Sequence, residues 1–453
     1  MSYVVMNQIG DSPIGEIFQG CDFQTQQKLS ILQIDTHLRQ ENYDANWRSL
    51  ERTFSLQQRN LERVVDSDKE SGRIFLEERG QSMKDLLQGP DLRIPQRIVR
   101  SIIYDILVLL VKFQEQRFIH GDIRPENLLL PVSDDQSPIR LAYSSGVYYG
   151  KELIFSRRNR KYIAPEMLNP RFGTISPATD LYCLAFSCLE LLFGNDFNYL
   201  FSRIGPDGNA HWTVLHGNSG EQLPPLRSVF PGIDYDLLYF FYTVTYRKVT
   251  DRPRCIRQFY FEMQNRYVLH QILLHLRRAE EISKQQIRAF RSFCHKAPLL
   301  KLLQERTGTR NPPDKKRIAI ILSEATNYLR TISVPDYVIN SLTYSVKPFV
   351  RPERYDVTLE FQADLEASET GDDSDESGPH PKSEYEFAPG FQTKTNENEK
   401  TASHRDELVS NLTGREVVEV QKQEPTLWET FLALFGKKKN TINSLIEEQK
   451  KKK

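Results

Sequence analysis

Residues 177–194 limit the possible folds of this chain most, because they combine helical character with apolar side chains on nearly every face. A helix of this kind avoids water all round, so it belongs at the centre of a large core. The run Leu181–Gly194 includes Cys183, Ser187 and Glu190 and is too short to span a bilayer. The sequence therefore predicts a buried central helix in a large globular domain.

The chain before and after this helix divides into a strand-rich start and a helical continuation. Residues 1–35 alternate apolar and polar side chains between glycines and prolines, which is typical of strands. Residues 43–62 and 95–118 are predicted to be helices, the second with the three- and four-residue apolar spacing of a buried face. We expect an α+β fold with a small β-rich lobe at about 1–80 and a larger helical lobe at about 81–265.

The composition changes along the rest of the chain. Residues 266–362 are predicted to form a mostly helical appendage, since an apolar helix face recurs within them. The stretch 363–424 is rich in charged and small polar side chains, with seven acids and no base between Asp364 and Glu376, which predicts a disordered linker. Residues 425–453 are predicted to contain an amphipathic, basic C-terminal helix.

The charge balance and the cysteines argue against several classes of protein. Sixty basic and sixty acidic residues give no net attraction to nucleic acid. The five cysteines are odd in number and lack CxxC spacing, which indicates reduced thiols instead of a disulfide framework or a zinc site. Because no signal peptide is visible, we expect a cytoplasmic protein.

The most informative motif is His120-Gly121-Asp122-Ile123-Arg124-Pro125-Glu126-Asn127. It resembles the catalytic loop of protein kinases, H-R-D-L-K-P-E-N. The resemblance covers about residues 1–265 and implies a bilobal protein-kinase-like fold of the serine/threonine type. It further implies that Asp122 accepts the proton of a substrate hydroxyl, that Asn127 holds a metal ion, and that Arg124 stands in place of the usual lysine. A chance loop is the alternative, and the motifs downstream weigh against it.

Further landmarks of the family follow in the family's order. The triplet Ala-Pro-Glu at 164–166 matches the A-P-E that closes the activation segment. Asp180 matches the aspartate that anchors the catalytic-loop backbone, and Arg252 matches the arginine that pairs with the triplet's glutamate, Glu166. The resemblance implies structural roles for these residues and for His120.

The glycine-rich loop of the family is present in altered form. Gly10 and Gly15 align with the first and last glycines of G-x-G-x-x-G, but Ser12 replaces the middle one and Pro13 follows it. Glycines let the backbone fold over phosphates and donate amides, whereas proline donates none. Asp11 adds a negative charge where phosphates would lie. An ordinary β-turn is the alternative for this stretch alone.

Two further positions depart from the family. Leu32 aligns with the lysine of the third strand, or Gln33 does if the register slips by one, and neither carries a charge. Tyr143 replaces the metal-binding aspartate of the D-F-G motif. Asp134 and Asp135 lie upstream, in the loop before that strand, and cannot simply substitute for it.

These departures predict a pseudokinase. Losing one preorganised electrostatic contact costs about 3–4 kcal/mol of transition-state stabilisation, and in this family lysine and magnesium supply such contacts. Glu51, our candidate partner for the missing lysine, has no evident task without it. We therefore expect a scaffold or regulatory binding module that has a protein partner and uses neither ATP nor magnesium. The alternative is a divergent active Ser/Thr kinase that transfers the γ-phosphoryl group of ATP to protein hydroxyls through Asp122, Arg124 and Asn127.

Two surface segments are candidates for contacts with partners. The stretch between Gly146 and Ile163 is basic, and it is either a solvated loop or a docking patch for an acidic partner, which could be the chain's own 364–376. Residues 427–435 place large apolar side chains before a lysine run. They could dock in a partner groove, pack on their own chain or rest on a membrane surface. The sequence leaves the oligomeric state open.

Overall fold

The structure is a computed structural model, and it describes residues 3–349 apart from 13, 36–42, 55–57, 88–92, 131–137, 144–146, 149–159, 195–196, 198–225 and 227–231. The predicted linker 363–424 and C-terminal helix 425–453 therefore lie outside the described residues. The same is true of Asp134 and Asp135, and of most of the basic stretch before Ile163.

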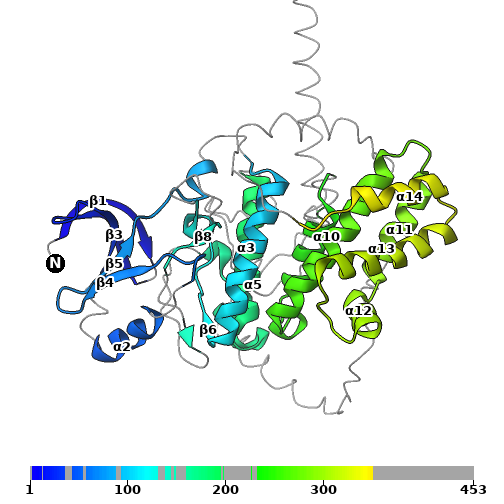
Figure 1. The fold of residues 1–453 in the computed structure, drawn as a ribbon. Coiled ribbons are helices and arrows are strands. Elements are labelled where there is room, and N and C mark those ends of the chain that lie inside the picture. Colours follow the sequence, from blue (N-terminus) through cyan, green and yellow to red (C-terminus); the bar gives the residue numbers. More distant parts are fainter. Residues whose placement is uncertain are drawn as a thin grey trace, which may run out of the picture. The chain divides into compact units, whose positions relative to one another are not determined.

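The N-terminal part of the chain forms a five-stranded antiparallel sheet in the order β1-β2-β3-β5-β4 (Figure 1). Its strands are β1 (Tyr3–Ser12), β2 (Gly15–Asp22), β3 (Lys28–Ile34), β4 (Val64–Asp68) and β5 (Arg73–Glu77). In the described part of the connection between β3 and β4 lies helix α2 (Tyr43–Phe54). The predicted helix at 43–62 is therefore too long, since Leu61 pairs as a β-bridge with Leu141 instead of being helical.

Strand alternation gives the sheet two apolar faces. Leu29 and Ile31 of β3 pack with Phe75 on one face. Leu32 and Ile34 point to the opposite face, where Trp47 of α2 covers them. Tyr143, from the larger lobe, also packs against this second face.

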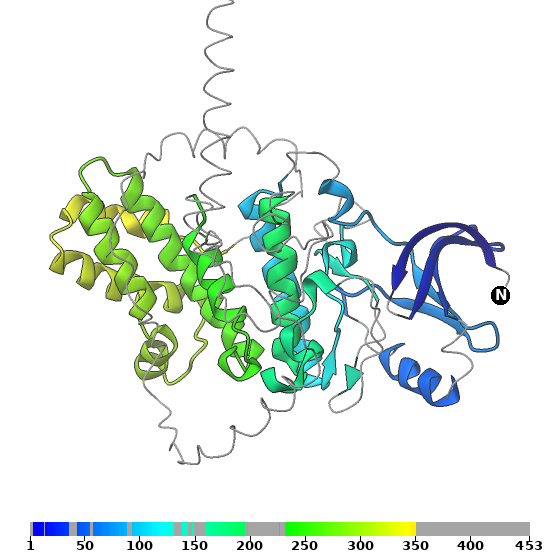
Figure 2. The same ribbon diagram turned by 180° about the vertical axis from the view of Figure 1, so that it is seen from behind.

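The larger lobe is built around two helices, α3 (Gln96–Glu115) and α5 (Pro177–Phe193), which lie side by side in Figures 1 and 2. Every residue of α5 is buried, so it is the central helix that the sequence predicts. Its start is fixed by a capping box between Ser176 and Thr179. The smaller elements of this lobe are η1 (Asp85–Leu87), β6 (Phe118–Ile119), η2 (Pro125–Asn127), β7 (Leu128–Leu129), β8 (Arg140–Leu141), β9 (Val147–Tyr148), η3 (Arg160–Tyr162), α4 (Pro165–Leu168), η4 (Pro170–Phe172), α9 (Tyr235–Val244) and η5 (Val249–Asp251).

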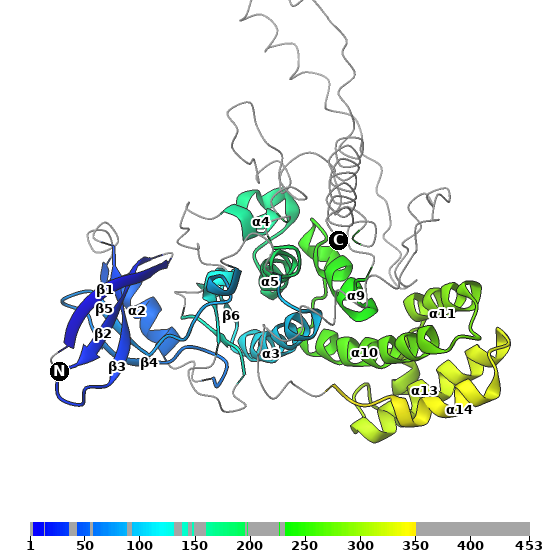
Figure 3. The same ribbon diagram turned by 90° about the horizontal axis from the view of Figure 1, so that it is seen from above.

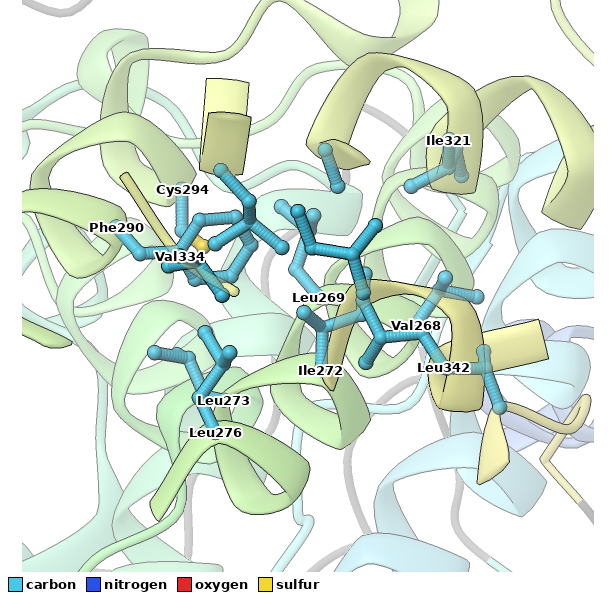
Figure 4. Close-up of a cluster of buried hydrophobic side chains, with 14 of the residues drawn as sticks. Val268, Leu269, Ile272, Leu273, Leu276, Phe290, Cys294, Ile321, Val334 and Leu342 are labelled. Carbon is cyan, nitrogen blue, oxygen red and sulfur yellow. The ribbon is translucent and has the colours of Figure 1, made fainter. Parts of the chain in front are cut away.

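One long helix, α10 (Ile256–Arg278), is shared by the larger lobe and the helices that follow it. It contacts α3 and α9, and also α11 (Lys284–Lys296), α12 (Leu299–Thr307), α13 (Asp314–Thr331) and α14 (Asp336–Ser345) (Figure 3). Figure 4 shows the apolar cluster that holds these later helices against α10, with Leu269, Phe290 and Ile321 among its members. The expected boundary between 265 and 266 falls inside α10.

The structure confirms the predicted α+β class, with a β-rich N-terminal lobe, a larger helical lobe and a helical C-terminal part. None of the described helices has the length and hydropathy to cross a membrane.

Candidate functional site

The octet at 120–127 forms a loop between β6 and β7 of the larger lobe. Gly121 has a φ of 77°, a left-handed value that side chains resist, and its absent side chain lets the loop turn there. The Asn127 side-chain amide donates to the Asp122 carboxylate over 2.7 Å and to the Asp122 carbonyl over 2.8 Å. Arg124 Nε lies 3.3 Å from the same carboxylate. The loop therefore brings Asp122, Arg124 and Asn127 into direct contact.

Burial sets the protonation of the two central side chains in this loop. It raises the pKa of Asp122 to about 6, although Arg124 and the hydrogen bond from Asn127 act in the opposite direction. It lowers the pKa of His120 to about 4. His120 Nδ1 accepts from the Asp122 amide over 3.2 Å while Nε2 lies 2.8 Å from the Ala142 carbonyl, which suits a neutral ring protonated at Nε2. His120 is thus neutral and joins the loop to the Ala142 carbonyl, while burial moves the pKa of Asp122 toward neutral pH.

Asp180, near the start of α5, anchors the backbone of this loop. Its carboxylate accepts the amide hydrogens of His120 and Gly121, each over 2.8 Å. Ser187, two turns further along α5, donates to the carbonyl of Ile123 over 3.0 Å. The central helix therefore holds the loop at three backbone groups.

Glu166 and Arg252 form a fully buried pair in the same lobe. Arg252 donates from two nitrogens to the two oxygens of Glu166, over 2.7 and 2.9 Å. Thr179 also donates to Glu166, over 2.7 Å, and Arg252 caps the carbonyls of Tyr246 and Arg247. With its lone pairs and protons satisfied in this way, the pair can remain charged away from water.

The third strand presents Leu32, and not Gln33, to the side of the sheet facing Tyr143. Leu32 has no exposed surface and packs in one apolar cluster with Ile17 and Tyr143. Gln33 points the other way, where its side chain donates to the Ser71 carbonyl over 2.9 Å. No register of β3 therefore places a cation at this point.

Tyr143 occupies the position where the family has a metal-binding aspartate, and its ring is part of the same apolar cluster. The side chain is 4% exposed and lies 6.2 Å from the ring of Phe54. Its backbone amide donates to Glu62 Oε2 over 2.8 Å. The neighbouring amide, of Ala142, donates to the carbonyl of Asn127 over 2.8 Å, so Tyr143 directly adjoins the catalytic loop.

Sequence reasoning missed an ion pair between Glu62 and Arg79. Arg79 donates from Nε and Nη2 to the two carboxylate oxygens of Glu62, over 3.2 and 3.1 Å; Glu62 is buried and Arg79 is nearly so. Its backbone amide donates to Ser30 Oγ over 3.2 Å. The two residues flank the β4–β5 hairpin, just before and just after it, so cross-strand pairing of opposite charges was the available signal.

The turn between β1 and β2 is held close to both the ion pair and the catalytic loop. A Cβ on Gly10 would lie 3.6 Å from Nη1 of Arg79. Arg124 Nη2 donates to the carbonyl of Asp11 over 3.0 Å. A Cβ on Gly15 would lie 1.9 Å from the Gln33 carbonyl oxygen, so no larger residue fits there. Arg79 and Arg124 thus reach this hairpin from two sides.

The comparisons with known proteins agree with this geometry. Residues 3–204 match the protein kinase domain family. This part of the chain is protein kinase-like. The serine/threonine-protein kinase MAK of Rattus norvegicus is 23% identical over 129 residues, which are 28% of this chain and 21% of that kinase. Cyclin-dependent kinase-like 5 of Homo sapiens is 22% identical over 171 residues, or 37% of this chain and 18% of that protein. The chain therefore spans about a fifth of the length of these relatives.

The residues of this kinase-like domain do not fit ATP and magnesium bound in the family's manner. Asn127 offers an amide oxygen for a metal, but Tyr143 supplies no second carboxylate, and Leu32 supplies no cation for phosphates. Ser12 Oγ accepts from the amide of Ile14 over 3.3 Å, which engages one of the hairpin amides. Glu51 is exposed, and its carboxylate accepts from the indole nitrogen of Trp47 over 2.9 Å.

Among the described residues, one group has the ligand spacing of a metal site: Asp234, Asp236 and His270. Arg100 of α3 already lies against it, with Nε 2.7 Å from Asp236 and Nη2 2.5 Å from Asp234. Burial lowers the pKa of His270, which keeps the ring neutral. A cation would have to displace a buried guanidinium, so this group fits an ion-pair network joining α3, α9 and α10 of the kinase-like lobe better than a metal site.

Proposed function

We propose that this protein is a pseudokinase, a kinase-like fold that serves as a scaffold or regulatory binding module. The observation that carries the proposal is the content of the space beneath the β1–β2 hairpin. Where the family has a lysine and a metal-binding aspartate, Leu32 and Tyr143 share one apolar cluster, and the ion pair of Arg79 with Glu62 lies beside Gly10.

Arg79, which reaches the hairpin near Gly10, already pairs with Glu62. For Arg79 to bind a phosphate it would have to leave Glu62, whose oxygens also accept from the amide of Tyr143. Breaking a buried pair and leaving one charge without its partner costs about 3–5 kcal/mol. A triphosphate would also meet Asp11 on the hairpin itself. These contacts support a domain whose lobes are held together without a bound nucleotide.

A second candidate function rests on the other half of the same site. Asp122, Arg124 and Asn127 keep the mutual contacts described above, and the pKa of Asp122, raised by burial to about 6, suits a general base. We therefore keep a divergent Ser/Thr protein kinase as the alternative. It would need a route to phosphate stabilisation that uses neither residue 32 nor residue 143.

A thermal-shift experiment separates the two functions. We expect the melting temperature of the full chain to be the same without nucleotide, with ATP alone, and with ATP plus magnesium or manganese, because ligands stabilise only what binds them. The matched activity assay uses radiolabelled ATP and a mixed protein substrate. Metal-dependent stabilisation, together with label transfer that Asp122→Ala abolishes, would overturn the pseudokinase proposal.

The binding role itself calls for a protein partner, and the C-terminal residues 427–435 are a candidate contact. Flotation with anionic liposomes, comparing the full chain with a chain ending at 424, tests whether a membrane surface is the target instead. We expect both forms to stay with the protein fraction. Flotation of the full chain alone would assign these residues to membrane contact.

A further inference from the structure

Three donors from two separate segments meet on one buried carboxylate of the central helix, Glu190. Lys161 Nζ lies 2.7 Å and Lys84 Nζ lies 2.8 Å from Oε1, and the hydroxyl of Tyr162 donates to Oε2. Glu190 is 3% exposed. A buried carboxylate needs such partners to remain charged, and here both of its oxygens are engaged.

The two lysines differ in how deeply they are held. The side chain of Lys161 is 12% exposed, and its ammonium lies 4.6 Å from the ring centroid of Phe197. The side chain of Lys84 is 42% exposed. Lys161 is therefore the tighter of the two contacts, and it comes from η3, at the end of the activation segment and just before Ala164.

This cluster lies next to the catalytic loop. The backbone amide of Lys84 donates to the carbonyl of Pro125 over 3.2 Å. Burial raises the pKa of Tyr162, and the nearby charges of Glu190 and Glu126 raise it further while Arg124 lowers it. Glu126 Oε2 is buried and has no hydrogen-bond partner. Lys84 therefore contacts both the catalytic loop and the carboxylate that holds Lys161.

We propose that Lys161 is a latch, which holds the C-terminal end of the activation segment on Glu190 without phosphorylation. The inference goes beyond the proposed function, because the latch would hold whether or not a nucleotide binds. It makes the surface around η3 and α4 a preformed feature of the protein.

Hydrogen exchange of the full chain, read by mass spectrometry on peptides covering residues 162–169, tests the latch. The reporter amides are those of Met167 and Asn169, which donate to Ala164 and Pro165. Lys161→Met keeps the apolar stem and removes the ammonium, and we expect exchange there to rise about tenfold as local opening becomes easier. Lys161→Arg keeps the charge and should stay near wild type.

Lys84→Met is the matched control, since it removes the other ammonium from the same carboxylate through a different segment. We expect it to leave the reporter peptides within about twofold of wild type. Unchanged exchange in Lys161→Met, or an equal rise in Lys84→Met, would overturn the latch. Peptides covering α10 report whether each variant is folded, because α10 does not contact η3 closely in the described part of the chain.

Discussion

The catalytic loop and the space under the β1–β2 hairpin belong to one site, yet they have different chemistry. Around the loop, the polar contacts of the kinase-like lobe are made: Asp180 holds two amides, and Asn127 holds Asp122. Under the hairpin, apolar side chains and an internal ion pair stand where phosphates would need a cation and a metal. The contacts around the loop stabilise the fold with or without nucleotide, whereas the cation and metal that are missing under the hairpin would be needed only for phosphoryl transfer.

The largest expected effect tests whether the loop side is held by folding contacts. Arg252→Met leaves Glu166 buried without its partner, so the free energy of unfolding should fall by about 3–5 kcal/mol. Urea denaturation followed by circular dichroism measures it. A loss of unfolding free energy below about 1 kcal/mol would mean that the ion pair adds little to stability, and would contradict the view that folding contacts hold the loop side of the site.

The next effect tests the hairpin side as an apolar core. Leu32→Ala removes a side chain with no exposed surface and should cost about 2–5 kcal/mol of unfolding free energy, through lost burial and the cavity left behind. Urea denaturation again gives the value, with Val4→Ala, at a 48% exposed position on β1, as the control. Similar small losses in both variants would mean that position 32 is not a core position.

A pH effect of intermediate size sharpens the role of His120. Burial lowers its pKa from 6.5 to about 4, so the unfolded chain binds the proton more readily between these values. Stability from this group is present above about pH 6.5 and is lost as the pH falls toward 4, by about 3 kcal/mol in total. The difference in unfolding free energy between wild type and His120→Gln should therefore shrink by that amount from pH 7 to pH 4. A difference that does not change with pH would contradict a neutral, buried ring.

The smallest effect concerns Lys28, the lysine nearest to the altered position on β3. Its ammonium lies 3.9 Å from Glu78, and both side chains are well exposed. Lys28→Ala should change the unfolding free energy by less than about 0.5 kcal/mol and should not alter nucleotide binding. Loss of a measurable ATP affinity in this variant would show that Lys28 replaces the missing cation.

Local sequence patterns were sufficient for the parts of the site that lie within a few residues of each other. The octet placed Asp122 beside Asn127, whereas the choice between Leu32 and Gln33 stayed open until the pairing of β3 showed Leu32 on the face with Tyr143. The pairing of Glu62 with Arg79 and of Glu190 with Lys161 was not predicted. These partners are brought together by the fold across strands and helices. Opposite charges flanking the β4–β5 hairpin were a signal for the first pair, whereas the second pair joins segments far apart in the chain and has no local signal.

The continuity of α10 also escaped prediction, because a change in composition near residue 265 suggested a domain boundary there. One face of the helix belongs to the cluster of Figure 4, while Tyr260 and Tyr267 face α3 and the returning Phe349. A break in this helix would expose apolar surface of both neighbours at once. The kinase-like lobe and the appendage should therefore unfold in a single cooperative transition. A ligand that binds either one would then raise the melting temperature of both.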